Sequence, residues 1–135
     1  MGIATQLSKE ILSEAEEIFG KAMEEYGVAV RKRDRIRLRD ACEKGWLTVV
    51  KLVDALLLSR GYKPAESHTD RRSKLWEIQE KDEGIKKLGL YDRLGARSYW
   101  LHVQGFYEGS LDEKAVAVEL AKVKEFMEDV KSLVM

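Results

Sequence analysis

The chain has 135 residues, a length that suits one core, and we expect a single helical domain over residues 1–135. Its composition, 44% hydrophobic and 36% charged, excludes a disordered chain, and no apolar run approaches the roughly 18 residues of a membrane span. Lys plus Arg and Asp plus Glu both number 24, so the net charge favours no nucleic-acid partner and any attraction must come from local patches.

Apolar residues at helical spacing predict a first helix over about residues 5–31 and a second over about residues 33–60. The later half of the second helix is apolar around most of its circumference, which predicts a central position. Gly61 directly after it is typical of a left-handed C-cap. Pro64, the only proline, prevents the helix from continuing.

Three more helices follow in the second half of the chain. Residues 67–70 predict the start of a short third helix, with Ser67 as its N-cap and His68 directly after the cap, and the Glu83-Gly84 pair is expected to end this helix. The fourth is expected from about residue 85 or 91 to residue 107, and residues 110–113 (SLDE) predict a capping box for a fifth. No strand pattern competes, so the expected fold is all-α, an up-and-down bundle of four to five helices.

The sequence offers little for metal or cofactor chemistry. Two histidines and one cysteine cannot make a conventional zinc site without carboxylates. A di-iron bundle would need a Glu three positions before each histidine, and His68 and His102 have Ala65 and Tyr99 there. Since no Gly-rich phosphate loop occurs either, we expect no metal and no cofactor.

The single cysteine and the first residues bear on localisation. Cys42 is alone, so an internal disulfide is excluded, and its apolar helix face predicts a buried, inert thiol. Lys9, Glu10 and Glu14 argue against a signal peptide at the start of the chain. We expect a cytoplasmic protein that does not bind a membrane.

The run RKRDRIRLR at residues 31–39 is the strongest local charge bias in the chain. One interpretation is a phosphate-binding patch, with Arg33, Arg35 and Arg37 as candidate contacts to nucleic acid. The alternative is a solvated face whose arginines pair with nearby carboxylates such as Asp34, which is the more usual role of charge runs on helical bundles.

The segment RSYWLHVQGFYE at residues 97–108 places Arg97 and His102 within the most aromatic part of the chain. Its first six residues resemble the Arg-x4-to-6-His signature of HEPN domains, small all-α bundles linked to nucleotide and RNA chemistry. Ser98 fills the position after the arginine, where that signature often has a polar residue.

A wider pattern is similar to the archaeal PaREP-type branch of HEPN proteins. Its elements here are Ala41 with Lys44, Gly45 and Trp46, then Ser67-His68, then Leu101-His102 followed by Phe106-Tyr107-Glu108. The sequence departs from the branch at Gly105, where an Asn is usual. HEPN toxins that are neutralised by tyrosine modification carry a Tyr where this chain has Gln104, so that mode of regulation is not expected.

The resemblance implies a homodimer in which the Arg/His segments of two chains meet near the two-fold axis, and active members are metal-independent endoribonucleases. His102 would act as general acid or base, Arg97 would hold the phosphate, and Ser98 would orient either group. Tyr99 or Tyr107 would stack on a base. RNA or a nucleotide and an antitoxin-like protein are the further partners that the resemblance suggests.

Two alternatives remain beside a nuclease: a non-catalytic nucleotide- or RNA-binding domain, and a dimeric protein-interaction or scaffolding module. On an ideal helix, positions five apart point about 140° away from each other. Arg97 and His102 therefore converge only through a local distortion, which Gly95 and Gly105 would permit, through the arginine's reach, or in a site shared by two chains. Otherwise both are packing residues, with Arg97 paired to Glu108 or to a carboxylate on another helix.

Overall fold

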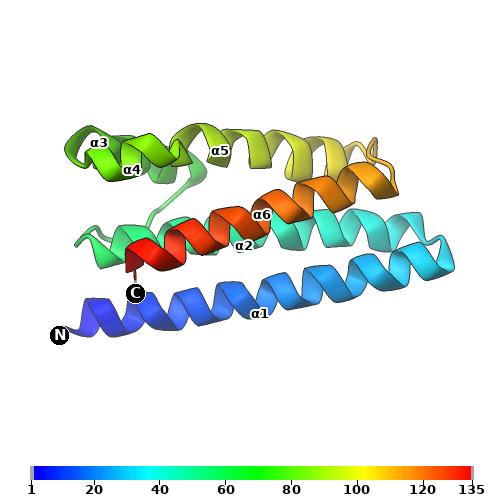
Figure 1. Cartoon of the computed structure of the whole chain (residues 1–135), viewed down its shortest axis with the longest axis horizontal. Coiled ribbons are helices and arrows are strands. Elements are labelled where there is room, and N and C mark those ends of the chain that lie inside the picture. The colour runs from blue at the N-terminus through cyan, green and yellow to red at the C-terminus, as the bar shows by residue number, and fades with distance from the viewer. Residues whose placement is uncertain (1, 135) are drawn as a thin grey trace.

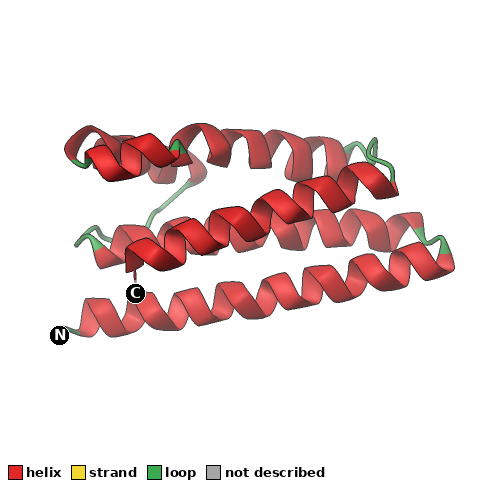
Figure 2. Cartoon of the chain, in the orientation of Figure 1, coloured by secondary structure: helices red, strands yellow, loops and turns green. Residues whose placement is uncertain are grey.

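The computed structural model describes residues 2–134, with the backbone alone at positions 3 and 4. It contains six α-helices and one π-helical segment: α1 (Ile3–Lys32), α2 (Arg35–Ser59), α3 (His68–Lys81), α4 (Glu83–Leu88), α5 (Leu90–Arg97), η1 (Ser98–Tyr107) and α6 (Glu113–Val134). The described residues form no strand (Figure 2), which confirms the all-α prediction, although the helices are more numerous than the four to five expected.

The long segments lie side by side and alternate in direction along the chain (Figure 1). The α1–α2 pair is the most extensive contact, and α2 also packs against α3, α5, η1 and α6. The predicted central position of the second helix is therefore confirmed. No helix within residues 2–134 combines the length and the apolar character that crossing a membrane requires.

Several helix ends follow from local residues, as predicted. Gly61, after α2, has a φ of 84°, the left-handed conformation that favours glycine. The Ser67 side chain caps α3 by accepting a hydrogen bond from the backbone N–H of Asp70 at 3.0 Å. Both signals depend only on neighbouring residues, so the sequence suffices to place them.

Two predicted boundaries were wrong. The third helix ends before Asp82, whose carboxylate accepts a hydrogen bond from the N–H of Ile85 at 3.2 Å, so the expected breaker pair Glu83-Gly84 instead begins α4. The predicted capping box is also absent. Asp112 caps α6 by accepting from the N–H of Ala115 at 2.8 Å, while Ser110 bonds to Gln104.

The segment η1 continues α5 without a break but winds more loosely. A π-helix joins each N–H to the carbonyl five residues earlier, as the 2.9 Å bond from Glu108 N–H to Val103 O shows. Gly105 allows η1 to pack closely on α2, because a Cβ there would stand 2.7 Å from the Sγ of Cys42. A local distortion, one of the alternatives considered for this segment, is thus present, and it spans the whole stretch between Arg97 and Glu108.

Candidate functional site

Arg97, the first residue of the motif, points into the protein. Its side chain is 7% exposed, and its Nη2 lies 3.0 Å from Oε1 of Glu119 on α6, which is also buried. Burial lowers the pKa of the guanidinium, whereas Glu119 acts in the opposite direction. Within this chain the arginine therefore holds η1 against α6, as the packing alternative predicted.

His102 turns to the other side, towards α2. Its Nδ1 lies 2.7 Å from Oε1 of Glu43, and both side chains are partly buried. An ionised carboxylate only accepts hydrogen bonds, so Nδ1 carries the proton, and in the neutral imidazole Nε2 is then an acceptor. Arg97 and His102 thus bind different carboxylates on different helices, and a single chain does not bring them together.

Aromatic rings surround the imidazole of His102. Its ring centroid lies 5.0 Å from Tyr107, 6.0 Å from Trp46 and 6.3 Å from Phe106. Trp46 is buried, whereas Tyr107 is 63% exposed. His102 therefore lies at the edge of a core cluster, between a buried indole and an accessible ring.

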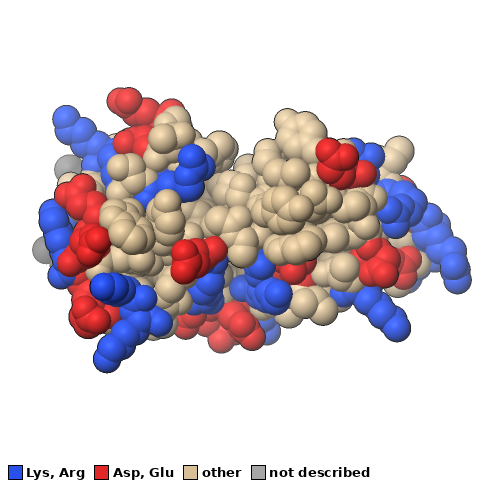
Figure 3. All heavy atoms as spheres, turned by 90° about the horizontal axis from the view of Figure 1, so that it is seen from above, with Lys and Arg blue, Asp and Glu red and all other residues tan. Residues whose placement is uncertain are grey.

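The outer side of η1 is also aromatic. Tyr99 and Trp100 are 50% and 41% exposed, and their rings meet edge to face at 4.9 Å. Figure 3 shows a broad area with few charged side chains over this part of the molecule. We call Tyr99, Trp100 and Tyr107 the aromatic face.

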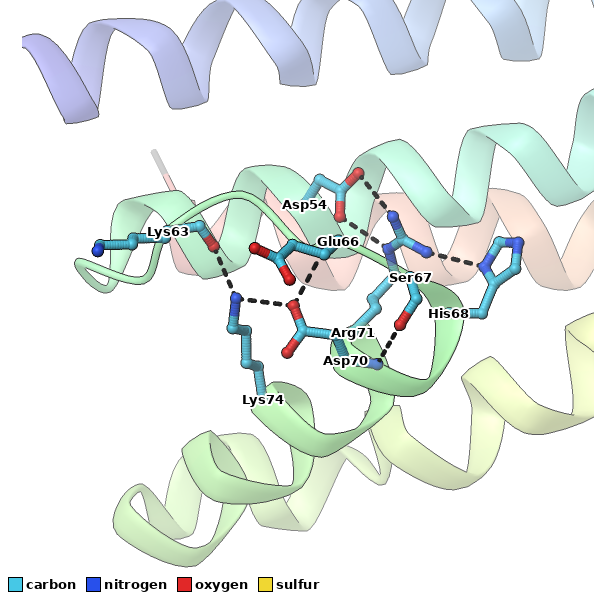
Figure 4. Close-up of polar contacts among 8 residues, drawn as sticks. All are labelled: Asp54, Lys63, Glu66, Ser67, His68, Asp70, Arg71 and Lys74. Carbon is cyan, nitrogen blue, oxygen red and sulfur yellow. Dashed lines mark hydrogen bonds and ion pairs between the residues drawn. The ribbon is translucent and has the colours of Figure 1, made fainter.

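His68 also contacts Trp46, with ring centroids 5.7 Å apart, so one indole has both histidines of the chain as neighbours. Arg71 donates from Nη1 to Nδ1 of His68 at 2.8 Å, and Asp54 binds the same guanidinium at 2.7 and 3.3 Å (Figure 4). Burial, then Arg71, His102 and Arg72, lower the pKa of His68, while Asp54 acts in the opposite direction.

The predicted site did not include His68, which was expected first as the residue after the Ser67 cap, with a binding role as the less favoured alternative. That local prediction is confirmed, but the cap does not reveal the contact with Trp46. One signal was available: the PaREP-type pattern contains Trp46, His68 and His102 together, although they lie in three separate segments.

A small hollow separates the start of α3 from the junction of α5 and η1. It is lined by Trp46, His68, Arg71, Arg72, Leu94, Gly95 and Ser98. The candidate residue Ser98 therefore belongs with the first histidine of the chain rather than with the Arg97–Glu119 pair.

The basic run at residues 31–39 lies at the C-terminal end of η1. Arg39 donates to the carbonyls of Phe106 and Tyr107 at 2.7 and 2.6 Å, and Arg35 donates to the carbonyl of Gly109 at 2.7 Å. Arg39 therefore satisfies the last carbonyls of η1, where a positive charge is favoured, and Arg35 binds the chain just beyond that end.

The other two candidate arginines are more accessible. Arg33 adopts the left-handed conformation that ends α1, and Arg37 contacts Asp34 at 4.0 Å. Both side chains are exposed, as is much of Arg35.

The grouping of possible metal ligands and the burial of Cys42 bear on metal and thiol chemistry. Within residues 2–134 no group of three or more His, Cys, Asp or Glu side chains is placed to hold a metal ion. Cys42 is buried, as predicted. Its burial, together with Glu119 and Glu43, raises the pKa of the thiol to about 11, so the reactive thiolate is disfavoured.

A comparison with protein families gives a match to the archaeal PaREP1/PaREP8 family over residues 11–127. The matched range contains every residue of the site described above, from the basic run to Glu119. No curated protein and no solved structure matches the chain.

Proposed function

The chain belongs to the archaeal PaREP1/PaREP8 family, and on that premise we propose that it is a HEPN-like domain that binds RNA or nucleotides and cleaves RNA without a metal ion. The observation that carries the proposal is the 2.7 Å contact between His102 Nδ1 and Glu43 Oε1. A carboxylate on Nδ1 fixes the tautomer that makes Nε2 a base, and it stabilises the imidazolium formed when that base takes a proton.

In the proposed reaction, Nε2 of His102 accepts the proton of a ribose 2′-hydroxyl. The 2′-oxygen then forms a bond to phosphorus, and the bond from phosphorus to the 5′-oxygen breaks. The leaving 5′-oxygen takes a proton from water, and the hydroxide produced recovers a proton from the imidazolium. The products are a 2′,3′-cyclic phosphate and a 5′-hydroxyl, and the imidazole is regenerated.

The other candidate residues take supporting roles in this proposal. Arg97, paired with Glu119, is a positioning residue that fixes η1 and so the direction of His102. Tyr107, in edge contact with the imidazole, and Tyr99 on the same segment offer exposed rings on which a base stacks. Arg33 and Arg37 offer exposed charge to the RNA backbone at the end of η1.

The test is cleavage of a labelled mixed-sequence RNA in EDTA at several protein concentrations. His102→Ala and Glu43→Ala are compared with the parent, and Lys87→Ala, an exposed position on α4, is the matched control. We expect parent and control to cleave, and both site variants to lose about 100-fold or more, the typical contribution of a general base. A His102→Ala protein that folds and cleaves like the parent would refute the assignment.

A second candidate function, a non-catalytic dimeric interaction module, is favoured by the aromatic face. Exposed aromatic side chains in a group are typical of interaction surfaces, and a second copy or an antitoxin-like protein would cover them. The salt dependence of RNA binding distinguishes the two functions. RNA affinity that falls steeply with salt supports the proposal, whereas little RNA binding at any salt supports the interaction module.

A further inference from the structure

A pocket of about 280 Å³ lies between the second half of α3 and the junction of α4 and α5, three helices that adjoin in one layer (Figure 1). Its volume is close to the lower end of the range of small-molecule sites, about 300–1,000 Å³, so it suits a single ring system. No residue of the His102 site lines it. The lining residues are Trp76, Gln79, Glu80, Lys86, Gly89 and Asp92.

Gln79 brings an unsatisfied donor to this pocket. The residue is 8% exposed, and its Oε1 accepts a hydrogen bond from the backbone N–H of Tyr91 at 2.8 Å, in the first turn of α5, where N–H groups lack partners within the helix. This bond fixes the side-chain amide, so Nε2 and its two N–H donors face the other way. Within residues 2–134 Nε2 has no hydrogen-bond partner, and it is not fully buried. It is therefore accessible from the pocket that Gln79 lines.

The other side chains of the pocket are an aromatic ring and charged groups. Trp76 is 51% exposed, and its ring meets that of Tyr91 edge to face, with centroids 5.1 Å apart. Glu80 and Asp92 are exposed carboxylates, and neither forms an ion pair with a side chain of the described residues. Lys86 is the one cation of the lining, so acceptors for N–H groups are in excess. The pocket thus offers a ring surface, an amide donor and free carboxylates.

We propose that this pocket binds a guanine base. Guanine carries on one edge the acceptor O6 and the two neighbouring donors N1–H and N2–H. The Nε2–H of Gln79 donates to O6, and a carboxylate of Asp92 or Glu80 accepts from the two donors. Trp76 stacks on the ring. Adenine has no such pair of neighbouring N–H donors, so the pocket prefers guanine. The inference does not rest on the proposed function, because it uses no residue of the His102 site.

The test uses the fact that the chain has three glutamines and no asparagine, so few side-chain amide signals appear in its ¹⁵N NMR spectrum. Guanosine, inosine and adenosine are titrated in turn into the labelled parent protein. We expect guanosine to shift the NH₂ signals of Gln79 and the indole N–H signal of Trp76. Inosine, which lacks the N2 amino group, should bind about tenfold more weakly, the effect of losing a hydrogen bond to a charged group. Adenosine should bind more weakly still.

Two variants test the groups directly. Gln79→Glu keeps an acceptor for the N–H of Tyr91 but removes the donor, and it should weaken guanosine binding about tenfold or more. Gln6→Glu, the same change at an exposed position of α1, should bind like the parent. Trp76→Ala changes an exposed side chain, so the fold should persist while guanosine binding falls about tenfold or more. Gln79 signals that do not respond to guanosine, or a Trp76→Ala protein that binds like the parent, would overturn the site.

These results separate the two proposals. Guanosine binding at Gln79 by a protein that cleaves no RNA supports the pocket and refutes the nuclease. Cleavage that depends on His102, with no guanosine response at Gln79, supports the nuclease and refutes the pocket. Adenosine that binds as tightly as guanosine would refute the assignment of guanine.

Discussion

Two residues of one motif, Arg97 and His102, have different surroundings, and this difference separates structural from functional roles. Arg97 and its partner Glu119 are both buried, so this ion pair exists at the cost of removing two charges from water. His102 and Glu43 are both partly exposed, so a ligand can reach the imidazole. At the scale of single residues, the arginine is buried in the core, and the histidine lies at the edge of the core, where it is partly accessible.

Replacing Arg97 with Ala should destabilise the protein by up to about 3–5 kcal/mol, because the buried Glu119 would keep only its 3.5 Å contact with Lys122, whose side chain is half exposed. Urea denaturation followed by circular dichroism measures this change. The double variant Arg97→Met with Glu119→Leu should recover most of the stability, since it removes both charges. A single variant as stable as the parent would show that the arginine does not hold η1.

The pKa of His68 should lie below its ordinary value of 6.5, since burial, Arg71, His102 and Arg72 all disfavour the charged form of the imidazole. The pKa of His68 is lower in the folded chain than in the unfolded chain, so between these two pKa values the unfolded chain binds a proton that the folded chain does not. His68 therefore leaves the free energy of unfolding undiminished above about pH 6.5 and lowers it as the pH falls through the folded pKa. NMR titration of the ring C–H measures the pKa, and a value at or above 6.5 would contradict the arrangement.

At the scale of elements, η1 shows why a π-helix escapes prediction from sequence. Helix ends such as Gly61 and the Ser67 cap depend on residues nearby in the chain, and they were predicted correctly. The winding of η1 depends on contacts from another helix. Gly105 lies against Cys42, and Arg39 binds the last carbonyls, 67 and 68 residues further along the chain.

The same reasoning applies to the site. Sequence patterns identified His102, but the roles of Glu43, His68 and Trp46 depend on three segments that meet only in the folded chain. Spacing within one helix predicted that Arg97 and His102 point apart, and within this chain they do. It could not predict which groups they meet, because those are carboxylates on neighbouring helices.

Arg39→Ala should destabilise the end of η1 by about 1–3 kcal/mol, because the carbonyls of Phe106 and Tyr107 lose their donors. Hydrogen exchange of the η1 amides should accelerate. Arg37→Ala is the matched control from the same run: its contact with Asp34 is exposed and 4.0 Å long, so η1 should exchange as in the parent. Equal exchange in both variants would refute the capping role of Arg39.

At the scale of the whole molecule, the helices leave the two sides of the central α2 unequal. One side is covered by α1 along its length, whereas the other carries α5 and η1 (Figure 1). The three exposed rings of the aromatic face belong to η1, and one of them, Tyr107, contacts the imidazole of His102. Any partner that covers this face therefore also borders the proposed site.

We expect that partner to be a second copy, so Trp100→Glu should convert a dimer into monomers by placing a charge in a desolvated interface. Sedimentation velocity over a range of protein concentrations measures this. Val118→Glu is the matched control, since Val118 is 53% exposed but lies on α6, and it should leave the dimer intact. A monomeric parent at every concentration would contradict the dimer. If the two copies jointly form the RNA site, Trp100→Glu should also lose cleavage at dilutions where the parent remains dimeric, because His102 would then lack the opposing surface against which RNA is held.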